Sequence, residues 1–139
     1  MSRRRSPLNS VPLLGAAAVI LSGMFAGAAA RPDEPEEVLS KYEKTGETVI
    51  CLSLMTVRRT DVVDDYAMLV STGRDTYINE MRGRCAGLRR ESRYVHEAPT
   101  GKMCSGDIIR VLDSFGGFRG SCTLGDFEKV IEIPEEDAE

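Results

Sequence analysis

The pattern of hydrophobic positions predicts a short helix followed by a series of strands. Val38, Leu39 and Tyr42 have helical spacing, with acidic residues before them and lysines after them, which is the polarity that a helix dipole favours. We therefore expect a helix over about residues 34–44, ended by Gly46. Beyond this glycine the apolar period becomes two, which is typical of strands.

Turn-forming residues divide the rest of the chain into short segments. Acidic, glycine-containing and proline-containing stretches interrupt runs of β-branched and aliphatic residues at close intervals. The expected elements are a first strand over 49–57, a polar bend over 58–61, strands over 62–63 and 67–70 joined by the Asp64–Asp65 turn, a second turn over 72–75, a return strand from Tyr77, a loop over 82–88 and a last strand within 123–133.

The stretch from Met103 to Asp113 combines a cysteine, a turn-forming segment and a β-branched run. It predicts a central strand with a covalent tether at its head, and Tyr94 is expected on a strand adjacent to Ile108. A glycine-rich loop from Phe115 to Phe118 follows, which we expect to fold onto the core; the alternative is that its aromatic residues line a ligand groove. Five to seven short strands predict a mainly all-β domain, a small partly closed barrel or bent antiparallel sheet, with one short N-terminal helix and two disulfides.

The first thirty residues have the organisation of a secretory signal peptide. Three arginines precede an apolar segment and a run of small residues suited to cleavage. The alternative is a retained membrane anchor, because residues 11–30 carry no charge and could span the hydrocarbon layer. The predicted organisation is a signal peptide over 1–30, a linker and short helix over 31–47, a β domain over 48–133 and an acidic disordered tail over 134–139.

Export would place the protein in the periplasm or outside the cell, and removal of residues 1–30 would change its net charge. The chain has a formal net charge of −4, and loss of three arginines and no acids makes it −7. A nucleic-acid partner is not expected, because phosphate binding requires a positive field. Contact with a membrane is expected only through an uncleaved signal peptide.

Four cysteines lie beyond the predicted signal peptide, at Cys51, Cys85, Cys104 and Cys122. An even number of cysteines in an oxidising compartment predicts two disulfides. A zinc site is disfavoured, because the chain has no Cys-x-x-Cys motif and one histidine. A domain of this size buries only about two-thirds of its unfolded surface, so covalent links would matter. No metal and no cofactor are expected.

The cysteine contexts resemble those of a family of small exported proteins from Gram-negative bacteria, known as a domain of unknown function. The resemblance covers roughly residues 48–128 and is carried by four segments, Cys51–Leu54, Arg82–Leu88, Met103–Asp107 and Ser121–Phe127. Relatives with a simpler pattern keep cysteines that correspond to Cys85 and Cys104. The resemblance therefore implies pairing of Cys85 with Cys104, and of Cys51 with Cys122. It implies no activity and no catalytic residues.

Five arginines within twelve residues form the candidate binding surface: Arg82, Arg84, Arg89, Arg90 and Arg93. Arginine binds phosphate and carboxylate through two parallel hydrogen bonds, so the cluster could recognise an anionic envelope component or an acidic partner. The alternative is a solvated segment whose charges balance nearby acids such as Glu80, Glu91 and Glu97.

No residue is predicted to be catalytic. His96 is the one side chain with an ordinary pKa near neutrality, so an enzymatic function would depend on it. Ser105 and Ser121 lack the Gly-x-Ser-x-Gly motif of a serine nucleophile. We expect a non-enzymatic binding or structural module of the cell envelope. The alternatives are a small secreted inhibitor of a hydrolase and, less favoured, an enzyme that uses His96.

Overall fold

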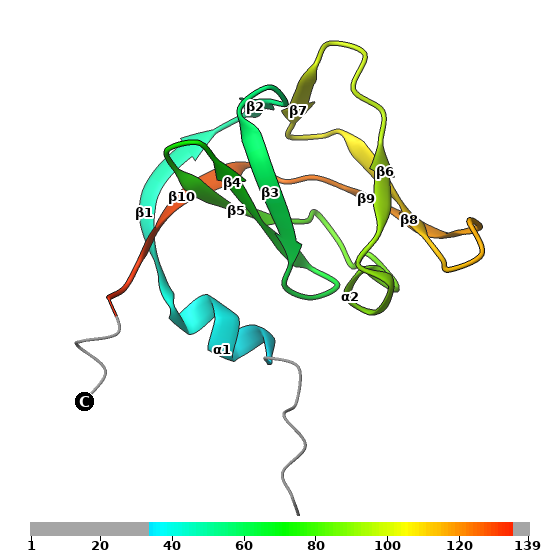
Figure 1. Cartoon of the computed structure of the whole chain (residues 1–139), viewed down its shortest axis with the longest axis horizontal. Coiled ribbons are helices and arrows are strands. Elements are labelled where there is room, and N and C mark those ends of the chain that lie inside the picture. Colours follow the sequence, from blue (N-terminus) through cyan, green and yellow to red (C-terminus); the bar gives the residue numbers. More distant parts are fainter. Residues whose placement is uncertain (1–33, 135–139) are drawn as a thin grey trace, which may run out of the picture. The chain divides into compact units, whose positions relative to one another are not determined.

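The computed structural model describes residues 34–134, in which short strands make up most of the regular structure (Figure 1). The described part contains two short helices, α1 (Pro35–Ser40) and α2 (Leu88–Glu91). It contains ten strands: β1 (Tyr42–Val49), β2 (Cys51–Ser53), β3 (Val57–Val62), β4 (Ala67–Thr72), β5 (Thr76–Glu80), β6 (Tyr94–His96), β7 (Lys102–Cys104), β8 (Ile108–Leu112), β9 (Phe118–Thr123) and β10 (Phe127–Glu132). The predicted all-β class is confirmed, although these strands outnumber the five to seven that were expected.

Within residues 34–134 the strands form three antiparallel sheets and close no barrel. The largest sheet has the order β1-β10-β5-β4-β3, a second has the order β6-β8-β9, and β2 pairs with β7. The predicted hairpin is present as β4 and β5, with the turn at residues 72–75. Tyr94 and Ile108 lie on the adjacent strands β6 and β8, as predicted.

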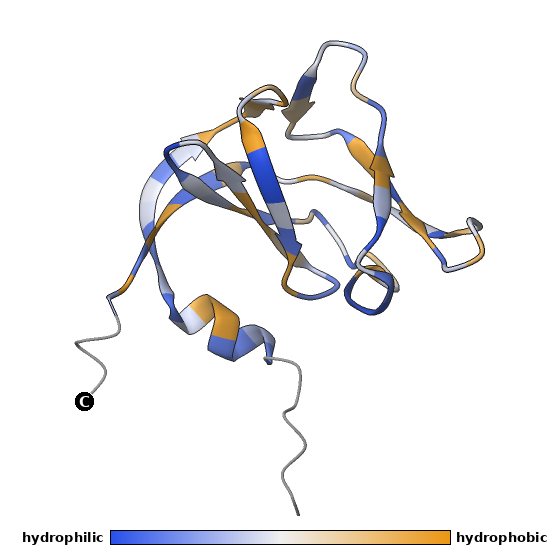
Figure 2. Ribbon diagram, viewed as in Figure 1, coloured by the Kyte–Doolittle hydropathy of each residue, from blue (hydrophilic) through white to orange (hydrophobic). Residues whose placement is uncertain are grey.

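The large sheet has apolar contacts on both faces, which explains the unbroken burial of β4. Met68 and Val70 face the main core, which they share with residues of β2, β7, β8 and β10. Leu69 faces the other way, into a smaller cluster with Val38 and Leu39 of α1. Figure 2 shows this apolar stretch in the middle of α1. A strand that is covered on both faces reads as a continuous hydrophobic run rather than as an alternation.

The predicted helix is shorter than expected and a strand occupies its second half. α1 ends at Ser40, and β1 begins at Tyr42, which pairs with Glu132 of β10. One or two helical turns are marginally stable without tertiary support, whereas residues 42–44 and 48–49 pair with β10 and gain backbone hydrogen bonds on one side. β1 lies at an edge of the sheet, so most of its side chains are exposed and its sequence carries no alternation.

The polar bend predicted over residues 58–61 is wrong, because these residues belong to β3. β3 is the other edge strand, and Thr60 and Asp61 pair with Val70 and Leu69 of β4. The Nε of Arg59 lies 2.6 Å from the Oδ1 of Asp61. Charged residues are common on edge strands, where they discourage pairing with other chains, so their presence does not mark a bend.

The disulfides are formed, but the pairing that the resemblance implied is wrong. Cys51 is bonded to Cys104, and Cys85 is bonded to Cys122. The first bond joins directly opposite residues of β2 and β7, and the second joins the loop before α2 to β9. The stretch from Met103 is accordingly two strands, β7 and β8, with the tether at the end of β7 and a turn between them.

The remaining predictions concern the glycine-rich loop and the two ends of the chain. Phe115 is 96% exposed and Phe118 is 60% exposed, so the glycine-rich loop does not fold onto the core as expected. The predicted signal peptide, residues 1–30, and the acidic tail beyond Pro134 lie outside the described residues. Within residues 34–134, no helix is long and apolar enough to cross a membrane.

A candidate anion-binding cleft beside the second helix

A cleft of about 830 Å³ lies where the end of β3, the loop before α2, α2 itself and β9 meet. We call it the arginine cleft. Ligand pockets in proteins commonly have volumes of about 300–1,000 Å³, so the cleft is large enough for more than one ligand group. Its lining combines aliphatic and cationic side chains and comprises Val62, Val63, Asp65, Arg84, Ala86, Gly87, Arg89, Arg90, Ser92 and Arg119.

Asp65 organises one wall of the arginine cleft. Its Oδ2 accepts hydrogen bonds from the Nε and Nη2 of Arg84, at 3.2 and 3.0 Å, and its Oδ1 accepts one from the backbone N–H of Arg89, at 3.0 Å. The backbone N–H of Cys85 also donates to the carbonyl of Asp65, at 2.6 Å. One residue in the β3–β4 turn therefore fixes both the loop before α2 and the start of that helix.

The charge state of Asp65 follows from these contacts. Its side chain is 18% exposed, and this burial acts to raise the pKa of the carboxyl. The hydrogen bonds from the Arg89 N–H and from Arg84, together with the charge of Arg84, outweigh burial and lower the pKa below its ordinary value. Asp65 is therefore ionised at neutral pH and pairs with the guanidinium of Arg84.

Two further carboxylates hold the opposite wall. The side chain of Glu91 is 9% exposed, and its Oε1 accepts hydrogen bonds from the Nε and Nη2 of Arg90, at 3.1 and 2.9 Å. Arg119 of β9 lies between two acids, with its Nε 4.0 Å from Glu91 and 3.6 Å from Asp113. The N–H groups of Phe115 and Gly117 also donate to Asp113.

The backbone N–H of Gly117 has the largest effect in lowering the pKa of Asp113, and the Arg119 charge acts in the same direction. Asp113 is therefore ionised at neutral pH and remains a counter-ion for Arg119.

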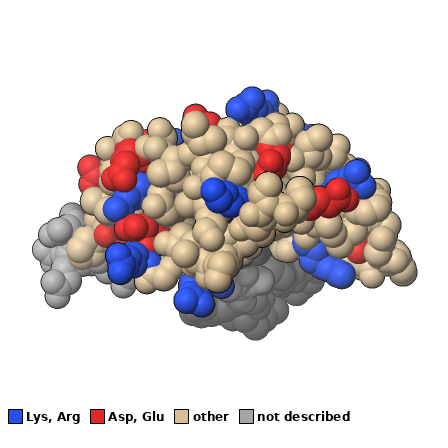
Figure 3. Space-filling model, turned by 90° about the horizontal axis from the view of Figure 1, so that it is seen from above, with Lys and Arg blue, Asp and Glu red and all other residues tan. Residues whose placement is uncertain are grey.

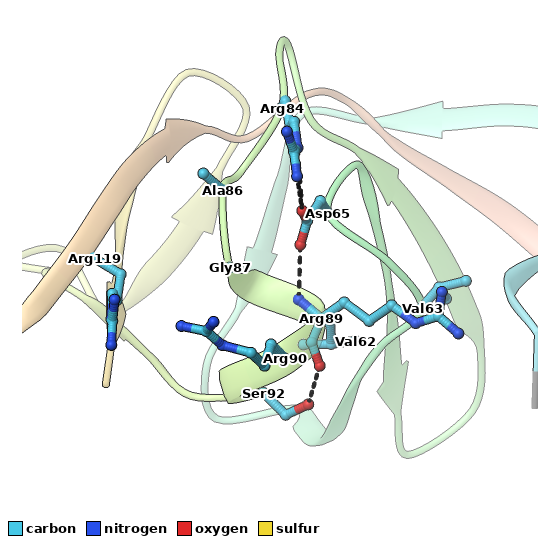
Figure 4. A pocket seen from close by; sticks show the side chains of 10 residues that line it. All are labelled: Val62, Val63, Asp65, Arg84, Ala86, Gly87, Arg89, Arg90, Ser92 and Arg119. Carbon is cyan, nitrogen blue, oxygen red and sulfur yellow. Dashed lines mark hydrogen bonds and ion pairs between the residues drawn. The ribbon is translucent and has the colours of Figure 1, made fainter. Parts of the chain in front are cut away.

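The two arginines of α2 are successive residues of a helix, so their side chains point in different directions. Gly87 precedes the helix with a φ of 83°, a left-handed conformation that glycine adopts without the steric cost that other residues incur. Ser92 ends it, also left-handed with a φ of 49°, and its hydroxyl donates to the carbonyl of Arg89. Figure 4 shows the side chain of Arg90 extending toward Arg119, and that of Arg89 extending toward Val63.

The guanidinium groups keep donors for a ligand. A guanidinium has five N–H donors, and the Asp65 and Glu91 contacts use only two each from Arg84 and Arg90. The Arg89 guanidinium forms no ion pair with any residue in the described range 34–134. Three of the four cleft arginines are therefore paired with carboxylates, and all four keep N–H donors for a ligand.

The structure brings together part of the predicted arginine cluster. Arg84, Arg89 and Arg90 line the cleft. The Nη2 of Arg82 instead donates to the hydroxyl of Ser105, and Arg93 lies immediately before β6, where its carbonyl accepts the Leu112 N–H. Arg119 joins the cleft from β9 and was missed. Its sequence position, about thirty residues from the others, gave no signal of proximity.

Basic residues elsewhere are interspersed with acids. On the face shown in Figure 3, Lys and Arg side chains alternate with Asp and Glu and do not form one continuous basic patch. This face therefore offers no extended cationic track, and the expectation that nucleic acid is not a ligand stays a prediction.

His96, the one candidate for acid–base chemistry, is held in a structural contact. Its side chain is 6% exposed, and its Nε2 lies 2.9 Å from the Oδ2 of Asp107, which also accepts the N–H of Cys104. Ser105 hydrogen-bonds to Asp126 and Arg82, not to His96. The His96–Asp107 contact therefore ties β6 to the β7–β8 turn.

Among the described residues 34–134, no group of three or more His, Cys, Asp or Glu side chains is arranged to hold a metal ion. Asp64 forms a turn, as predicted, by accepting hydrogen bonds from the N–H groups of Tyr66 and Ala67.

Comparison of the chain with protein-family models, curated proteins and solved structures finds no match, so the resemblance to the exported family stays a prediction.

Proposed function

We propose that this protein is an exported, non-enzymatic binding module of the cell envelope, and that its arginine cleft binds a carboxylate of a partner protein. The observation that carries the proposal is the set of three guanidiniums held at one side by half-buried acids, beside the Arg89 guanidinium, with further donors unused. Preorganised arginines of this kind bind carboxylates with little loss of side-chain entropy. The two disulfides and the N-terminal sequence pattern support export.

Charge favours a carboxylate over a cluster of phosphates. Four guanidiniums line the cleft, and three of them are paired with carboxylates, one in the lining (Asp65) and two beside it (Glu91 and Asp113), so the excess positive charge is small. A polyphosphate or lipid A head group would be repelled by the three acids, whereas one carboxylate group could be accommodated. The same cleft is lined by the aliphatic side chains of Val62, Val63 and Ala86. An aliphatic residue next to the acidic residue of the ligand would therefore also make contacts in the cleft. The preferred ligand is an acidic peptide segment that contains aliphatic residues.

Isothermal titration calorimetry at low salt tests this proposal. The probe is an acetylated, amidated hexapeptide of alternating glutamate and leucine, and the control peptide has glutamine in place of glutamate. We expect the glutamate peptide to bind and the glutamine peptide to bind much more weakly. The variant Arg89→Glu/Arg90→Glu should weaken binding at least about tenfold, because one charge-assisted hydrogen bond contributes ~1.5–3 kcal/mol.

A matched variant separates the cleft from general charge. Arg58 and Arg74 are exposed arginines outside the arginine cleft, so Arg58→Glu/Arg74→Glu changes the net charge by the same amount. This control should bind the glutamate peptide like the wild type, apart from a modest salt-dependent effect. Equal weakening by both double variants, or tighter binding of inorganic phosphate than of the peptide, would refute the proposal.

Inhibition of a hydrolase is a second candidate, which one observation favours. Met55 is 87% exposed on a turn held by the hydrogen bond from the Thr56 N–H to the Ser53 carbonyl, next to the Cys51–Cys104 disulfide. A rigid loop with an exposed apolar side chain lowers the ordering cost of binding. Chymotrypsin-like, elastase-like and lysozyme-like enzymes should be assayed with the wild type and with Met55→Asp. Inhibition that Met55→Asp abolishes would support this candidate, and no inhibition of any of these enzymes would count against it.

A further inference from the structure

The two disulfides lie in opposite environments. Cys51 is exposed and Cys104 is half-buried, whereas Cys85 is fully buried and Cys122 is 8% exposed. Thiol–disulfide exchange requires a thiolate to reach one sulfur along an open approach, so accessibility decides which bond can react in the folded protein. The difference in burial therefore implies a difference in chemistry.

The strand pairing explains why the Cys51–Cys104 bond faces outward. Leu52 pairs with Met103 across β2 and β7, and both are buried in the main core. Successive side chains on a strand point to opposite faces, so the neighbouring pair, Cys51 and Cys104, lies on the face turned away from that core. The exposure of Cys51 and the alternation of these strands agree.

The Cys85–Cys122 bond belongs to the interior. Both residues are members of the main hydrophobic cluster, with Leu88 and Ile109 among the other members. A reagent can reach this bond only if the loop before α2 or β9 first opens. Its reduction is therefore coupled to partial unfolding.

We propose that the Cys51–Cys104 bond is a thiol–disulfide exchange site that takes a dithiol as its reactant, while Cys85–Cys122 is a permanent structural link. A thiolate of the dithiol attacks the sulfur of the exposed residue Cys51, the Cys51–Cys104 bond breaks and Cys104 leaves as a thiolate that takes up a proton. The second thiol of the dithiol then attacks the mixed disulfide and releases Cys51 as a thiol. Two protein cysteines are reduced, and the dithiol is oxidised to a disulfide.

The region opened by this reaction is small. β2 and β7 share three residue pairs, and the turns beside them are joined by the bonds from the Leu54 N–H to the Gly101 carbonyl and from the Ser105 N–H to the Ile50 carbonyl. A two-stranded sheet of this length is marginally stable without a covalent link. Reduction should therefore loosen residues 97–107 and leave the sheet that contains β4 intact. The exchange site and the arginine cleft are independent of each other.

Selective reduction tests the proposal. The folded full-length chain, in its oxidised form, is incubated with dithiothreitol, free thiols are alkylated at successive times, and peptide mass spectrometry locates the label. Cys51 and Cys104 should become labelled at a rate proportional to dithiothreitol concentration and insensitive to low urea. Labelling of Cys85 and Cys122 should be at least about tenfold slower and should accelerate with urea, because it requires opening of the core.

Two further measurements make the result decisive. Cys51→Ala/Cys104→Ala should lose the rapid phase of labelling and keep the slow one. Hydrogen exchange of the wild type should show faster exchange over residues 97–107 after the rapid phase, with unchanged protection in β4. Labelling of all four cysteines at one rate, or of Cys85 and Cys122 first, would overturn the proposal. Unchanged hydrogen exchange over residues 97–107 would contradict the claim that reduction opens this region locally.

Discussion

Removing each disulfide separately should reveal the difference in burial as a difference in stability. Cys51–Cys104 and Cys85–Cys122 close loops with sequence separations of 53 and 37. In the chain-entropy model each loop restricts the unfolded state by about 4 kcal/mol, and the two values differ by only a few tenths of a kcal/mol. Chain entropy alone therefore predicts nearly equal losses for the two alanine double variants.

Core packing makes the stability losses of the two variants unequal. Cys85 and Cys122 lie in the core, where removal of a methylene-sized group costs roughly 1 kcal/mol with its cavity, so Cys85→Ala/Cys122→Ala loses about 2 kcal/mol more. The expected losses are about 6 kcal/mol for this variant and about 4 kcal/mol for Cys51→Ala/Cys104→Ala. Because the net stability of such a domain is ~5–15 kcal/mol, both losses are large.

Urea unfolding followed by circular dichroism measures the two losses in the full-length chain. The buried-pair variant should have the lower midpoint, or be unfolded without urea under conditions in which the exposed-pair variant still folds. A buried-pair variant that is as stable as the exposed-pair variant, or more stable, would refute the argument from packing.

Three other predictions concern single residues. Asp65→Asn should lose ~1–3 kcal/mol of unfolding free energy at pH 7, because the charge-assisted contacts with Arg84 are weakened. Because the folded state lowers the pKa of Asp65, this stabilisation is full above its unfolded pKa of about 3.9 and is lost as pH falls through the lower folded value. Urea unfolding should therefore show a smaller difference in unfolding free energy between the wild type and Asp65→Asn at pH 2.5 than at pH 7. Asn79→Ala should cost ~2–4 kcal/mol in the same assay, because fully buried Asn79 pairs with both the N–H and the carbonyl of Gly125. Gly125→Ala should express as unfolded protein by circular dichroism, because an added Cβ would collide with the carbonyl oxygen of Glu80; a folded Gly125→Ala variant would contradict this packing.

The sequence predicted the parts of the fold that have strong local signals. The β4–β5 hairpin has an apolar run on each side of a Thr-Gly-Arg-Asp turn, so its pattern alone was sufficient. The edge strands β1 and β3 were mistaken for helix and bend, because exposed edge strands carry charges and no clear alternation. Their pairing depends on β10 and β4, and no local pattern reports those contacts.

The candidate site and the disulfide connectivity depend on long-range contacts more than the strands do. Arg84, Arg89 and Arg90 were identified because they are close in sequence, but Arg119 reaches the cleft only through the pairing of β9 with β8. The pairing of Cys51 with Cys104 follows from the register of β2 and β7, in which the two cysteines are directly opposite. Sequence spacing alone allows three pairings and does not distinguish among them.

The central claim is that the arginine cleft recognises a carboxylate, and nuclear magnetic resonance of the arginine Nε–H groups tests it most directly. The wild-type chain is titrated with the alternating glutamate–leucine peptide at low salt. The account predicts saturable shifts of Arg84, Arg89, Arg90 and Arg119, with Arg58 and Arg74 unchanged. Shifts confined to Arg58 and Arg74, or no saturable shift in any of the four cleft arginines, would contradict it.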